Sequence, residues 1–519
     1  MTWIVIGEEK GAIKLVSKSG TTGLLPRGSY LTVESGKGKY ILRVDDSKQY
    51  EPYSPSPLII DMDLSPLKQD QKCQNIIIYA SRVKDLIERD DGLIDYIPPQ
   101  SKARRSKQEE IDVAVGQEEE GPKVFLATVH LSQNQLLIDD AKKPITVKLP
   151  HDLFYHQTLI CGKTGSGKTV ASKYLAQYFV EKMDGAVLAI NVKDVDFLKM
   201  DKKSITKNPD VKKEWATLQQ KPHGITNFTT YFPASIDISS APGISRDLCK
   251  KITLNVKEIE PESLSGLLRG ITDIAAQNLP NIFRFWKERI AINMDDYSFT
   301  DFVNYFTRAA DSGRRFPTMN LRGEETAEIT LHSQTFSNLQ RNLNLAIDFF
   351  DNPEAESLYW DDILYPGKMS VINVAGQNGI EFGSILLRHL LHQIVQVKSQ
   401  QKSETPILII IDEVHQFYNT ESSKEALGDL DTICRTGRSQ KIGVIFSSQN
   451  PQDIPRGLSS VINTKIFFKT DITTAKAHGI QATTDIFENL EQGYAAVNIH
   501  DLSKVKFIKF PLALSGVFE

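Results

Sequence analysis

An eight-residue motif restricts the fold of this chain more than any other feature. Residues 162–169 read Gly-Lys-Thr-Gly-Ser-Gly-Lys-Thr and match the pattern G-x-x-x-x-G-K-[ST] at every fixed position. An apolar stretch over residues 158–161 precedes the motif, and a stretch with helical periodicity follows it. Such a loop needs a strand before it and a helix after it, because backbone N–H groups and the positive helix end together surround an anion. The motif therefore predicts an α/β fold and a bound nucleoside triphosphate.

The residues of the loop have distinct expected roles. Lys168 would neutralise charge on the β- and γ-phosphates, and the Thr169 hydroxyl would bind Mg²⁺. We expect the cofactor-binding residues to be Gly162, Lys163, Thr164, Gly165, Ser166, Gly167, Lys168, Thr169 and Val170.

A second signal lies at residues 406–413, which read Pro-Ile-Leu-Ile-Ile-Ile-Asp-Glu. A buried strand that ends in an acidic residue is the usual partner of a phosphate loop, because the strand tip lies beside the loop in the sheet. Asp412 would bind Mg²⁺ through water. Glu413, one residue further, would take the proton of an attacking water molecule.

The sequence also favours ATP over GTP and hydrolysis over kinase chemistry. It contains no N-K-x-D motif, which guanine recognition would require; residues 191–194 carry the letters in another order. Small-molecule kinases seldom need a hydrolytic glutamate such as Glu413. We therefore expect an ATPase with ATP and Mg²⁺ as cofactors.

A third group of polar residues follows the second signal. Arg435 and Arg438 come at the end of the helix expected after Glu413, where an oligomeric ring would present one of them to a neighbouring nucleotide. An arginine in that place offsets charge that develops in the transition state. Gln449 ends the next strand and would sense the γ-phosphate by hydrogen bonding. Lone arginines of this kind are more often ordinary surface residues.

Length and charge set further limits. A chain of 519 residues is too long for one hydrophobic core, so we expect several domains. The net charge of −4 means that any contact with nucleic acid must be a local basic feature. The four cysteines show no C-x-x-C spacing, which is typical of reduced thiols rather than a zinc site. Without a signal peptide or a membrane-length apolar run, we expect a cytoplasmic protein with no membrane contact.

We expect five segments along the chain. Residues 1–150 contain short apolar runs between Gly- and Ser-containing turns, which is typical of a small β-barrel. Residues 151–255 and 354–499 alternate strands and helices and predict the two parts of a RecA-like ATPase core. Residues 256–353 predict a helical insertion, and residues 500–519 a C-terminal strand or tail.

Particular runs carry these expectations. The barrel segment includes a basic stretch over residues 102–107 and an acidic one over residues 109–120, which together are typical of a charged, solvated loop. The insertion shows helical spacing at Leu264, Leu267, Leu268, Ile271 and Ile274. Further core strands are expected at Ala186–Val192, Met369–Val374, Ile407–Ile411, Gly443–Ser447 and Ile466–Phe468.

Over nearly its whole length the chain resembles the HerA family of hexameric DNA translocases, which are relatives of FtsK. The residues that carry the resemblance are the phosphate loop, the strand end Ile411-Asp412-Glu413-Val414-His415, the segment Arg435-Thr436-Gly437-Arg438 and the strand end Ser448-Gln449-Asn450-Pro451. The resemblance implies a RecA-like core with a helical insertion, a small N-terminal barrel and a homohexameric ring around double-stranded DNA. It also implies a nuclease or other effector protein that docks near the barrel.

The chain departs from the family pattern at several positions. His156 stands where the family often has an arginine before the phosphate loop, and Asn450 replaces another arginine. Two extra residues precede Gly443, so both Arg435 and Arg438 stay candidates for the arginine that acts across the subunit boundary, with Arg438 preferred.

DNA contacts are harder to assign. A lysine-rich stretch follows the second core strand and would bind phosphates without reading sequence, although such a stretch is more often a solvated loop. Its lysines are Lys199, Lys202, Lys203 and Lys207.

The sequence as a whole predicts an ATP-dependent translocase or helicase motor on double-stranded DNA, in DNA end processing or antiviral defence. One alternative is an ATP-gated hexameric scaffold that assembles and regulates a partner effector enzyme with little translocation. A metabolic P-loop kinase is a third alternative, but the large helical insertion and the paired arginines argue against it.

Overall fold

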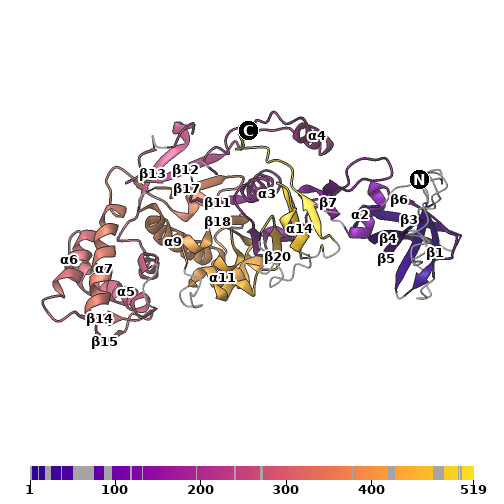
Figure 1. Cartoon of the computed structure of the whole chain (residues 1–519). Coiled ribbons are helices and arrows are strands. Elements are labelled where there is room, and N and C mark those ends of the chain that lie inside the picture. The colour runs from indigo at the N-terminus through magenta and orange to yellow at the C-terminus, as the bar shows by residue number, and fades with distance from the viewer. Residues whose placement is uncertain are drawn as a thin grey trace, which may run out of the picture. The chain divides into compact units, whose positions relative to one another are not determined.

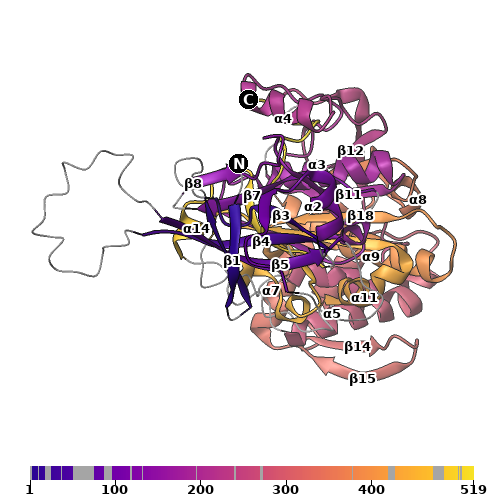
Figure 2. The same cartoon turned by 90° about the vertical axis from the view of Figure 1, so that its right-hand side faces the viewer.

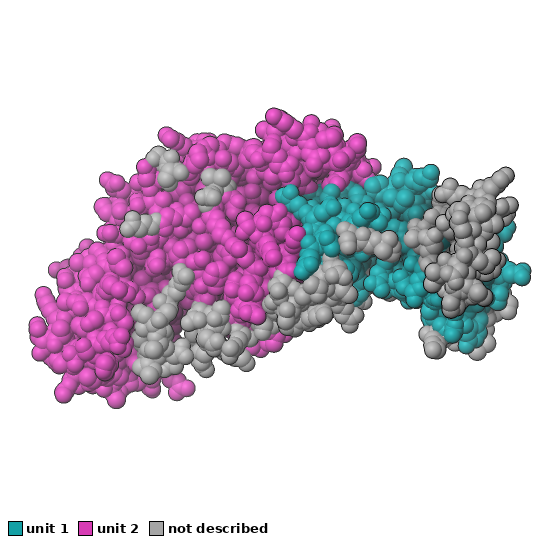
Figure 3. Space-filling model, viewed as in Figure 1, with its two compact units in different colours: residues 1–151, 471–511 teal, residues 152–470, 512–519 magenta. Residues whose placement is uncertain are grey.

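The computed structural model describes most of the chain as two compact units, which Figure 3 shows in different colours. Unit 1 comprises Met1–His151 with Asp471–Pro511, and unit 2 comprises Asp152–Thr470 with Leu512–Glu519. The finer boundaries of the five expected segments stay predictions. The described residues are 3–9, 11–17, 25–36, 38–50, 75–86, 96–116, 120–130, 133–193, 196–238, 241–268, 273–376, 378–418, 427–470, 484–500, 502 and 505–519.

Short strands of unit 1 close into a barrel, which confirms the predicted small N-terminal barrel. Side chains alternate between buried and partly exposed along β1 and β2, as the period of two in a strand requires. Trp3, Leu15 and Leu31 are among the residues that fill the interior. Around the barrel the strands follow the order β1 (Trp3–Glu9), β2 (Ala12–Ser17), β5 (Asn75–Asp85), β4 (Gly38–Tyr50), β3 (Tyr30–Ser35) and β6 (Lys102–Arg105).

The charged stretch of unit 1 is not simply a solvated loop, because Lys102–Arg105 of its basic part form strand β6 of the barrel. Helix α2 (Gln108–Val115) occupies most of the acidic run, while residues 117–119 lie outside the described residues. Glu110 is only 7% exposed and accepts hydrogen bonds from the Lys107 backbone N–H at 2.8 Å and from Arg104 at 2.7 Å. A buried carboxylate with this set of partners orders the segment as a helix, which charge patterning alone does not reveal.

Unit 1 also contains antiparallel strands that join distant parts of the sequence. Strand β7 (Lys123–His130) pairs with β8 (Gln133–Leu136) and β9 (Thr146–Lys148). It pairs as well with β22 (Phe507–Lys509), whose other neighbour is β21 (Tyr494–Asn498).

The centre of unit 2 is a parallel sheet. All residues of its five central strands are buried, which is what a sheet covered on both faces requires. The strand order is β16 (Glu356–Ser357), β13 (Cys249–Thr253), β12 (Phe228–Pro233), β17 (Met369–Asn373), β11 (Ala186–Asn191), β18 (Ile407–Asp412), β19 (Ile442–Ser448), β10 (Thr158–Cys161) and β20 (Thr464–Phe467). The expected core strands are therefore present, with ends shifted by one or two residues.

Helices cover both faces of this sheet. Helix α3 (Lys168–Lys182) lies on one side of β11 and β18, and α9 (Gly379–Ser399) and α11 (Asp429–Thr436) lie on the other (Figures 1 and 2). The fold is thus the predicted α/β fold, a RecA-like P-loop core with a helical insertion and a small N-terminal barrel.

The insertion is mainly helical but contains an unpredicted hairpin. Its helices include α5 (Asp273–Phe285), α6 (Phe299–Arg308) and α7 (Ser333–Ala346). Strands β14 (Arg315–Met319) and β15 (Glu325–Thr330) form the hairpin, which both views place beside α5 and α7 (Figures 1 and 2).

The leucine-rich run of the insertion forms a 3-10 helix, η4 (Pro261–Leu268), rather than an α-helix. Leu264, Leu267 and Leu268 are buried as their spacing predicts, whereas Ile271 lies outside the described residues. A Cβ atom on Gly266 would come within 2.7 Å of the backbone nitrogen of Ile385. This close approach to α9 fixes the local path of the chain.

The last residues of the chain pack onto the core of unit 2. Leu512 and Leu514 form a small apolar cluster with Trp215 of α4 (Pro209–Thr217), whose indole N–H donates to the Leu512 carbonyl at 2.8 Å. The Lys173 ammonium donates to the Gly516 carbonyl at 2.7 Å, and burial lowers its pKa to about 8. The C-terminal segment is therefore held along α3.

Candidate functional site

The phosphate loop connects β10 to α3 with the backbone that its glycines allow. Gly165 has φ +77° and Gly167 has φ +116°, a region that other residues rarely adopt. The Lys168 ammonium donates hydrogen bonds to the carbonyl oxygens of Gly162 at 2.6 Å and Lys163 at 3.3 Å. The loop thus curves around its lysine at the beginning of α3.

The interior of this loop fits a phosphate group. The Ser166 hydroxyl is buried and has no hydrogen-bond partner among the residues that the structure describes. Burial lowers the pKa of Lys168 despite the nearby carboxylates of Asp412 and Glu413. An anion at this helix end would accept from backbone N–H groups and neutralise the lysine. The donor set that the sequence predicts for a triphosphate is therefore present.

The expected cofactor-binding residues differ in exposure. Lys163, Thr164 and Gly165 at the tip of the loop are exposed, whereas Gly162, Ser166 and Lys168 are buried. Gly167, Thr169 and Val170 are half-buried, and Val170 packs against the cluster around Trp215. The loop therefore offers its tip and the first turn of α3 to a ligand.

The tips of three neighbouring strands meet beside this loop. Strand β19 lies between β18 and β10, with Ser447 opposite Asp412 and Ser448 opposite Cys161. Since parallel strands end at the same edge, the acidic pair is brought next to the phosphate loop, as expected. Asp412 is 6% exposed, and burial raises the pKa of its carboxyl.

The backbone turns sharply at Glu413. This residue has φ +49° and ψ +58°, and its N–H donates to the Ser447 carbonyl at 2.8 Å. A left-handed conformation is unfavourable for a residue with a side chain and is characteristic of functional sites. The carboxylate of Glu413 contacts Lys193 and Gln449, which follow two other strands of the sheet.

The Glu413 carboxylate has hydrogen-bond partners on one oxygen. Its Oε1 forms an ion pair with Lys193 and accepts from the Gln449 amide at 2.9 Å, while its buried Oε2 has no hydrogen-bond partner among the described residues. Burial opposes ionisation of Glu413, but the hydrogen bonds from Lys193 and Gln449 outweigh it and lower the pKa of the carboxyl. An ionised carboxylate with one oxygen that accepts no hydrogen bond from the described residues has the form that a general base requires.

Lys193 is a site residue that the sequence motifs do not mark. It lies two residues after β11, which neighbours β18 in the sheet, and its side chain is 44% exposed. A polar residue directly after a buried parallel strand lies at the same edge as the other strand ends. The sequence therefore places Lys193 at this edge of the sheet, but it does not show that Lys193 pairs with Glu413.

The two candidate arginines contact acidic residues of their own chain. Arg435 Nε lies 2.8 Å from an oxygen of Asp431, and Arg438 Nη2 lies 2.6 Å from an oxygen of Asp152. Their side chains are 39% and 61% exposed. Among the described residues, neither arginine contacts Asp412 or Glu413, so any role at a nucleotide stays a prediction.

Two of the four candidate DNA-contacting lysines are engaged within unit 2. Lys199 lies over the ring of Phe518 at 5.6 Å, and Lys202 donates to the Gly243 carbonyl at 2.5 Å. Lys203 and Lys207 are exposed. Contact with DNA stays a prediction for this stretch.

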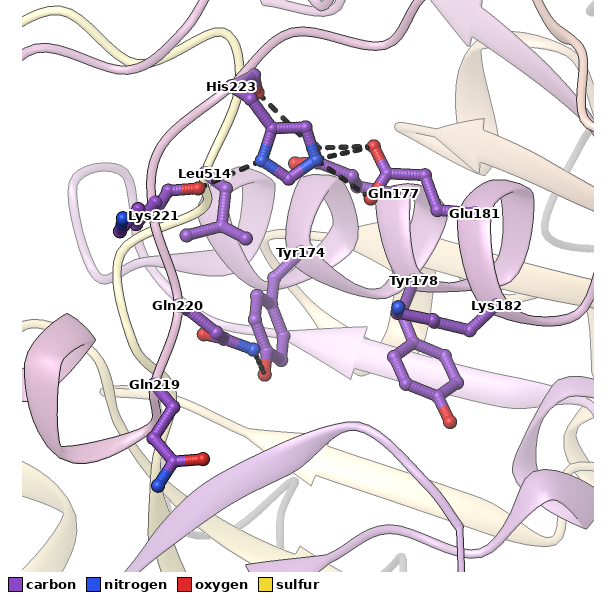
Figure 4. Close-up of a pocket in the computed structure, with 10 residues that line it drawn as sticks. All are labelled: Tyr174, Gln177, Tyr178, Glu181, Lys182, Gln219, Gln220, Lys221, His223 and Leu514. Atoms are coloured by element: carbon purple, nitrogen blue, oxygen red, sulfur yellow. Dashed lines mark hydrogen bonds and ion pairs between the residues drawn. The ribbon is translucent and has the colours of Figure 1, made fainter.

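A cavity of about 400 Å³ beside α3 is separate from the phosphate loop (Figure 4). Its walls come from α3, from residues 219–223 and from Leu514. His223 Nε2 lies 2.9 Å from both carboxylate oxygens of Glu181, and the Gln220 amide donates to the Tyr174 hydroxyl at 3.0 Å. None of the expected site residues lines this cavity, so we assign these contacts to the packing of α3 against the segment beside it.

Two family models match the chain. The model described as helicase HerA, central domain, matches residues 135–394, which is half of the chain. The model described as helicase HerA-like C-terminal matches residues 370–502. The chain belongs to the HerA family. This membership confirms the family that the motifs indicated.

HerA proteins of two archaea are similar to part of the chain. The protein of Sulfurisphaera tokodaii, named DNA double-strand break repair helicase HerA, is 22% identical over 188 residues, or 34% of this chain and 38% of that protein. The protein of the same name from Saccharolobus solfataricus is 22% identical over 220 residues, or 39% of this chain and 44% of that protein. The alignments thus span less than half of either relative.

A solved structure, that of VirB4 of Thermoanaerobacter pseudethanolicus, is weakly similar to the chain. It has a TM-score of 0.46 and 12% identity, and the alignment covers 76% of this chain and 97% of that one. Among the residues that the structure describes, no helix combines the length and apolar character that crossing a membrane requires.

Proposed function

We propose that this HerA-family chain is an Mg²⁺-dependent ATPase and that hydrolysis drives movement along double-stranded DNA as part of a homohexameric ring. The observation that carries the proposal is the meeting of three strand ends, which brings the phosphate loop, Asp412 and Glu413 to one edge of the sheet. The names of the two archaeal relatives support DNA as the partner.

Each residue at this edge of the sheet would have a separate role in ATP hydrolysis. Lys168 and the N–H groups at the beginning of α3 bind the phosphates, and Thr169 and Asp412 hold the cation. When bound, Mg²⁺ draws negative charge from the phosphate oxygens. Gln449 holds the Glu413 carboxylate through Oε1 and would report on the γ-phosphate.

Glu413 is the general base in this proposal. Its ionised carboxylate takes the proton of the attacking water on Oε2, the oxygen without a hydrogen-bond partner. Arg438, or Arg435 in its place, would stabilise transition-state charge in the neighbouring subunit.

The base role predicts that Glu413→Gln binds ATP but loses turnover by about 10²- to 10⁴-fold, since the amide cannot accept the proton. Turnover is measured by phosphate release, and binding by titration with a fluorescent ATP analogue. Glu404→Gln, an exposed glutamate before β18, is the control and should retain turnover. Near-normal turnover in Glu413→Gln would remove Glu413 from this role.

DNA coupling is tested separately, by ATP hydrolysis with and without linear double-stranded DNA at low and moderate salt. A motor that binds the DNA phosphates should hydrolyse ATP faster with DNA, and this stimulation should decrease as the salt concentration rises. An equal rate of ATP hydrolysis with and without DNA would favour the ATP-gated scaffold instead. The barrel belongs to unit 1 and the proposed catalytic residues belong to unit 2, which supports the barrel as the docking part for a nuclease or other effector.

A further inference from the structure

A histidine and an acidic residue lie on the open side of Glu413. His415 follows in the short helix η8 (Val414–Gln416), and Asp453 ends η10 (Pro451–Asp453). His415 Nδ1 lies 3.6 Å from Glu413 Oε2 and 3.5 Å from Asp453 Oδ2. The three ligand atoms lie within 4.8 Å of one another.

The burial of this group points to a missing ligand. Glu413 is 2% exposed, yet within the described part of the chain its Oε2 has no hydrogen-bond partner, and neither has the buried Nδ1 of His415. Leaving a buried charged oxygen without a hydrogen bond is costly. The two atoms lie 3.6 Å apart, so one cation bound between them would satisfy both.

We propose that Glu413, His415 and Asp453 form a binding site for a transition-metal ion of the zinc class, beside the Mg²⁺ position at Thr169 and Asp412. Ligand atoms about 2.0–2.1 Å from a tetrahedral Zn²⁺ ion are about 3.4 Å from one another. The distances from His415 Nδ1 to the two carboxylates are close to that value.

The donor types select the metal. Mg²⁺ prefers oxygen ligands only, whereas an imidazole with two carboxylates suits Zn²⁺ and its neighbours in the first transition row. Two negative charges against the single charge of Lys193 leave the site attractive to a dication.

Groups around the three ligands would orient them. The Ser448 hydroxyl donates to Asp453 Oδ2 at 2.6 Å, and the Gln416 amide lies 3.3 Å from the second ring nitrogen of His415. Metal binding at Nδ1 leaves the ring proton on Nε2, and this N–H would donate a hydrogen bond to the Gln416 amide oxygen once the amide is flipped.

An occupied site would affect hydrolysis. The metal would use Oε2 of Glu413, the oxygen to which the proposed function assigns the proton of the attacking water. Zn²⁺ should therefore inhibit turnover, and this consequence rests on the proposed function, whereas metal binding itself does not.

The test is calorimetric titration of the full chain with Zn²⁺ in excess Mg²⁺ and without nucleotide. We expect one equivalent to bind, and His415→Ala and Asp453→Asn to weaken binding more than about tenfold. Asp453→Asn keeps an acceptor for Ser448, so it separates ligand loss from misfolding. His223→Ala removes a histidine that pairs with only one carboxylate, Glu181, and should leave Zn²⁺ binding unchanged.

The outcomes separate the metal site from the base role. Absence of Zn²⁺ binding, or equal binding by the wild type and His415→Ala, overturns the metal site. The second readout is the rate of ATP turnover at a buffered concentration of free Zn²⁺. We expect Zn²⁺ to inhibit the wild type and to inhibit Asp453→Asn less. Site-specific binding without inhibition supports the metal site and overturns the base role of Glu413.

Discussion

Single residues decide how the Glu413 carboxylate is presented. A left-handed backbone at this position turns the side chain toward Lys193 and Gln449, which both contact Oε1. The two contacts hold the carboxylate ionised in a place where burial alone would favour its neutral form. Orientation and charge of the proposed base thus depend on residues from two other strand ends.

Lys193 is therefore expected to act as a positioning residue. Lys193→Ala removes the ion pair but leaves the Gln449 contact, so we predict a fall in kcat of about tenfold with little change in the KM for ATP. Steady-state hydrolysis measures both constants. Lys193→Arg should recover part of the loss, because it restores a cation at the carboxylate.

Lys212→Ala serves as the control, since Lys212 is exposed on α4. An unchanged kcat in Lys193→Ala would mean that Gln449 alone fixes Glu413. A rise in kcat would mean that the ion pair restrains the base instead of orienting it.

At the scale of elements, continuous apolar runs were the most reliable signal. Residues 158–161 and 407–411 are flanked by turn residues and have no polar face, so they could only be buried strands of a covered sheet. The strand ends then fixed the place of Asp412 and Gln449. This is why most of the candidate site could be predicted from the sequence.

The elements that the sequence did not reveal depend on contacts between distant residues. Strand β15 is mostly exposed and polar, so the hairpin in the insertion has no apolar alternation to mark it. The contact of Lys193 with Glu413 joins residues 220 positions apart. The charged run forms helix α2 because Glu110 accepts hydrogen bonds from Arg104 and Thr32 of the barrel.

The burial of Glu110 has a measurable consequence for the barrel. Burial opposes its ionisation, but hydrogen bonds from Arg104, Lys39, the Lys107 backbone and Thr32 hold the pKa of this carboxyl well below its usual range. A carboxyl with a lowered pKa in the fold stabilises the fold above its unfolded pKa of about 4.3. That contribution is lost as the pH falls from there through the folded pKa.

We therefore predict that Glu110→Gln destabilises the barrel by about 1.5–3 kcal/mol at neutral pH, the value of hydrogen bonds to a charged group. Hydrogen exchange of β3 and β4 in the full chain measures the loss of protection. The difference from the wild type should shrink below pH about 4.3. Glu109→Gln changes an exposed glutamate on the same helix turn and should have little effect; equal effects of the two substitutions would contradict the prediction.

At the scale of the whole molecule, the proposed ring requires that one subunit completes the site of another. Arg438 is largely exposed, and its pairing with Asp152 is a surface ion pair. Such pairs contribute only about 0–1 kcal/mol, so Arg438 can leave Asp152 for a phosphate at little cost. Arg435, paired with Asp431 on its own helix, has the same freedom.

Mixing two inactive variants tests this role. We predict that Arg438→Ala loses about 10³-fold or more in turnover, as expected for an arginine that stabilises transition-state charge. When it is mixed with Glu413→Gln, turnover should recover, because an intact Glu413 in one subunit then faces an intact Arg438 in its neighbour. Arg341→Ala, an exposed arginine on α7, should retain turnover alone.

Mixing Arg435→Ala with Glu413→Gln decides between the two candidates. Turnover should recover only in the mixture whose arginine variant lacks the arginine that acts across the subunit boundary. If neither mixture recovers although both variants assemble with Glu413→Gln subunits, the arginine acts within its own subunit. In that case Arg438 would have to leave Asp152 for a nucleotide in the same chain. Each active site would then be complete without its neighbour, and a ring would be needed only to enclose DNA.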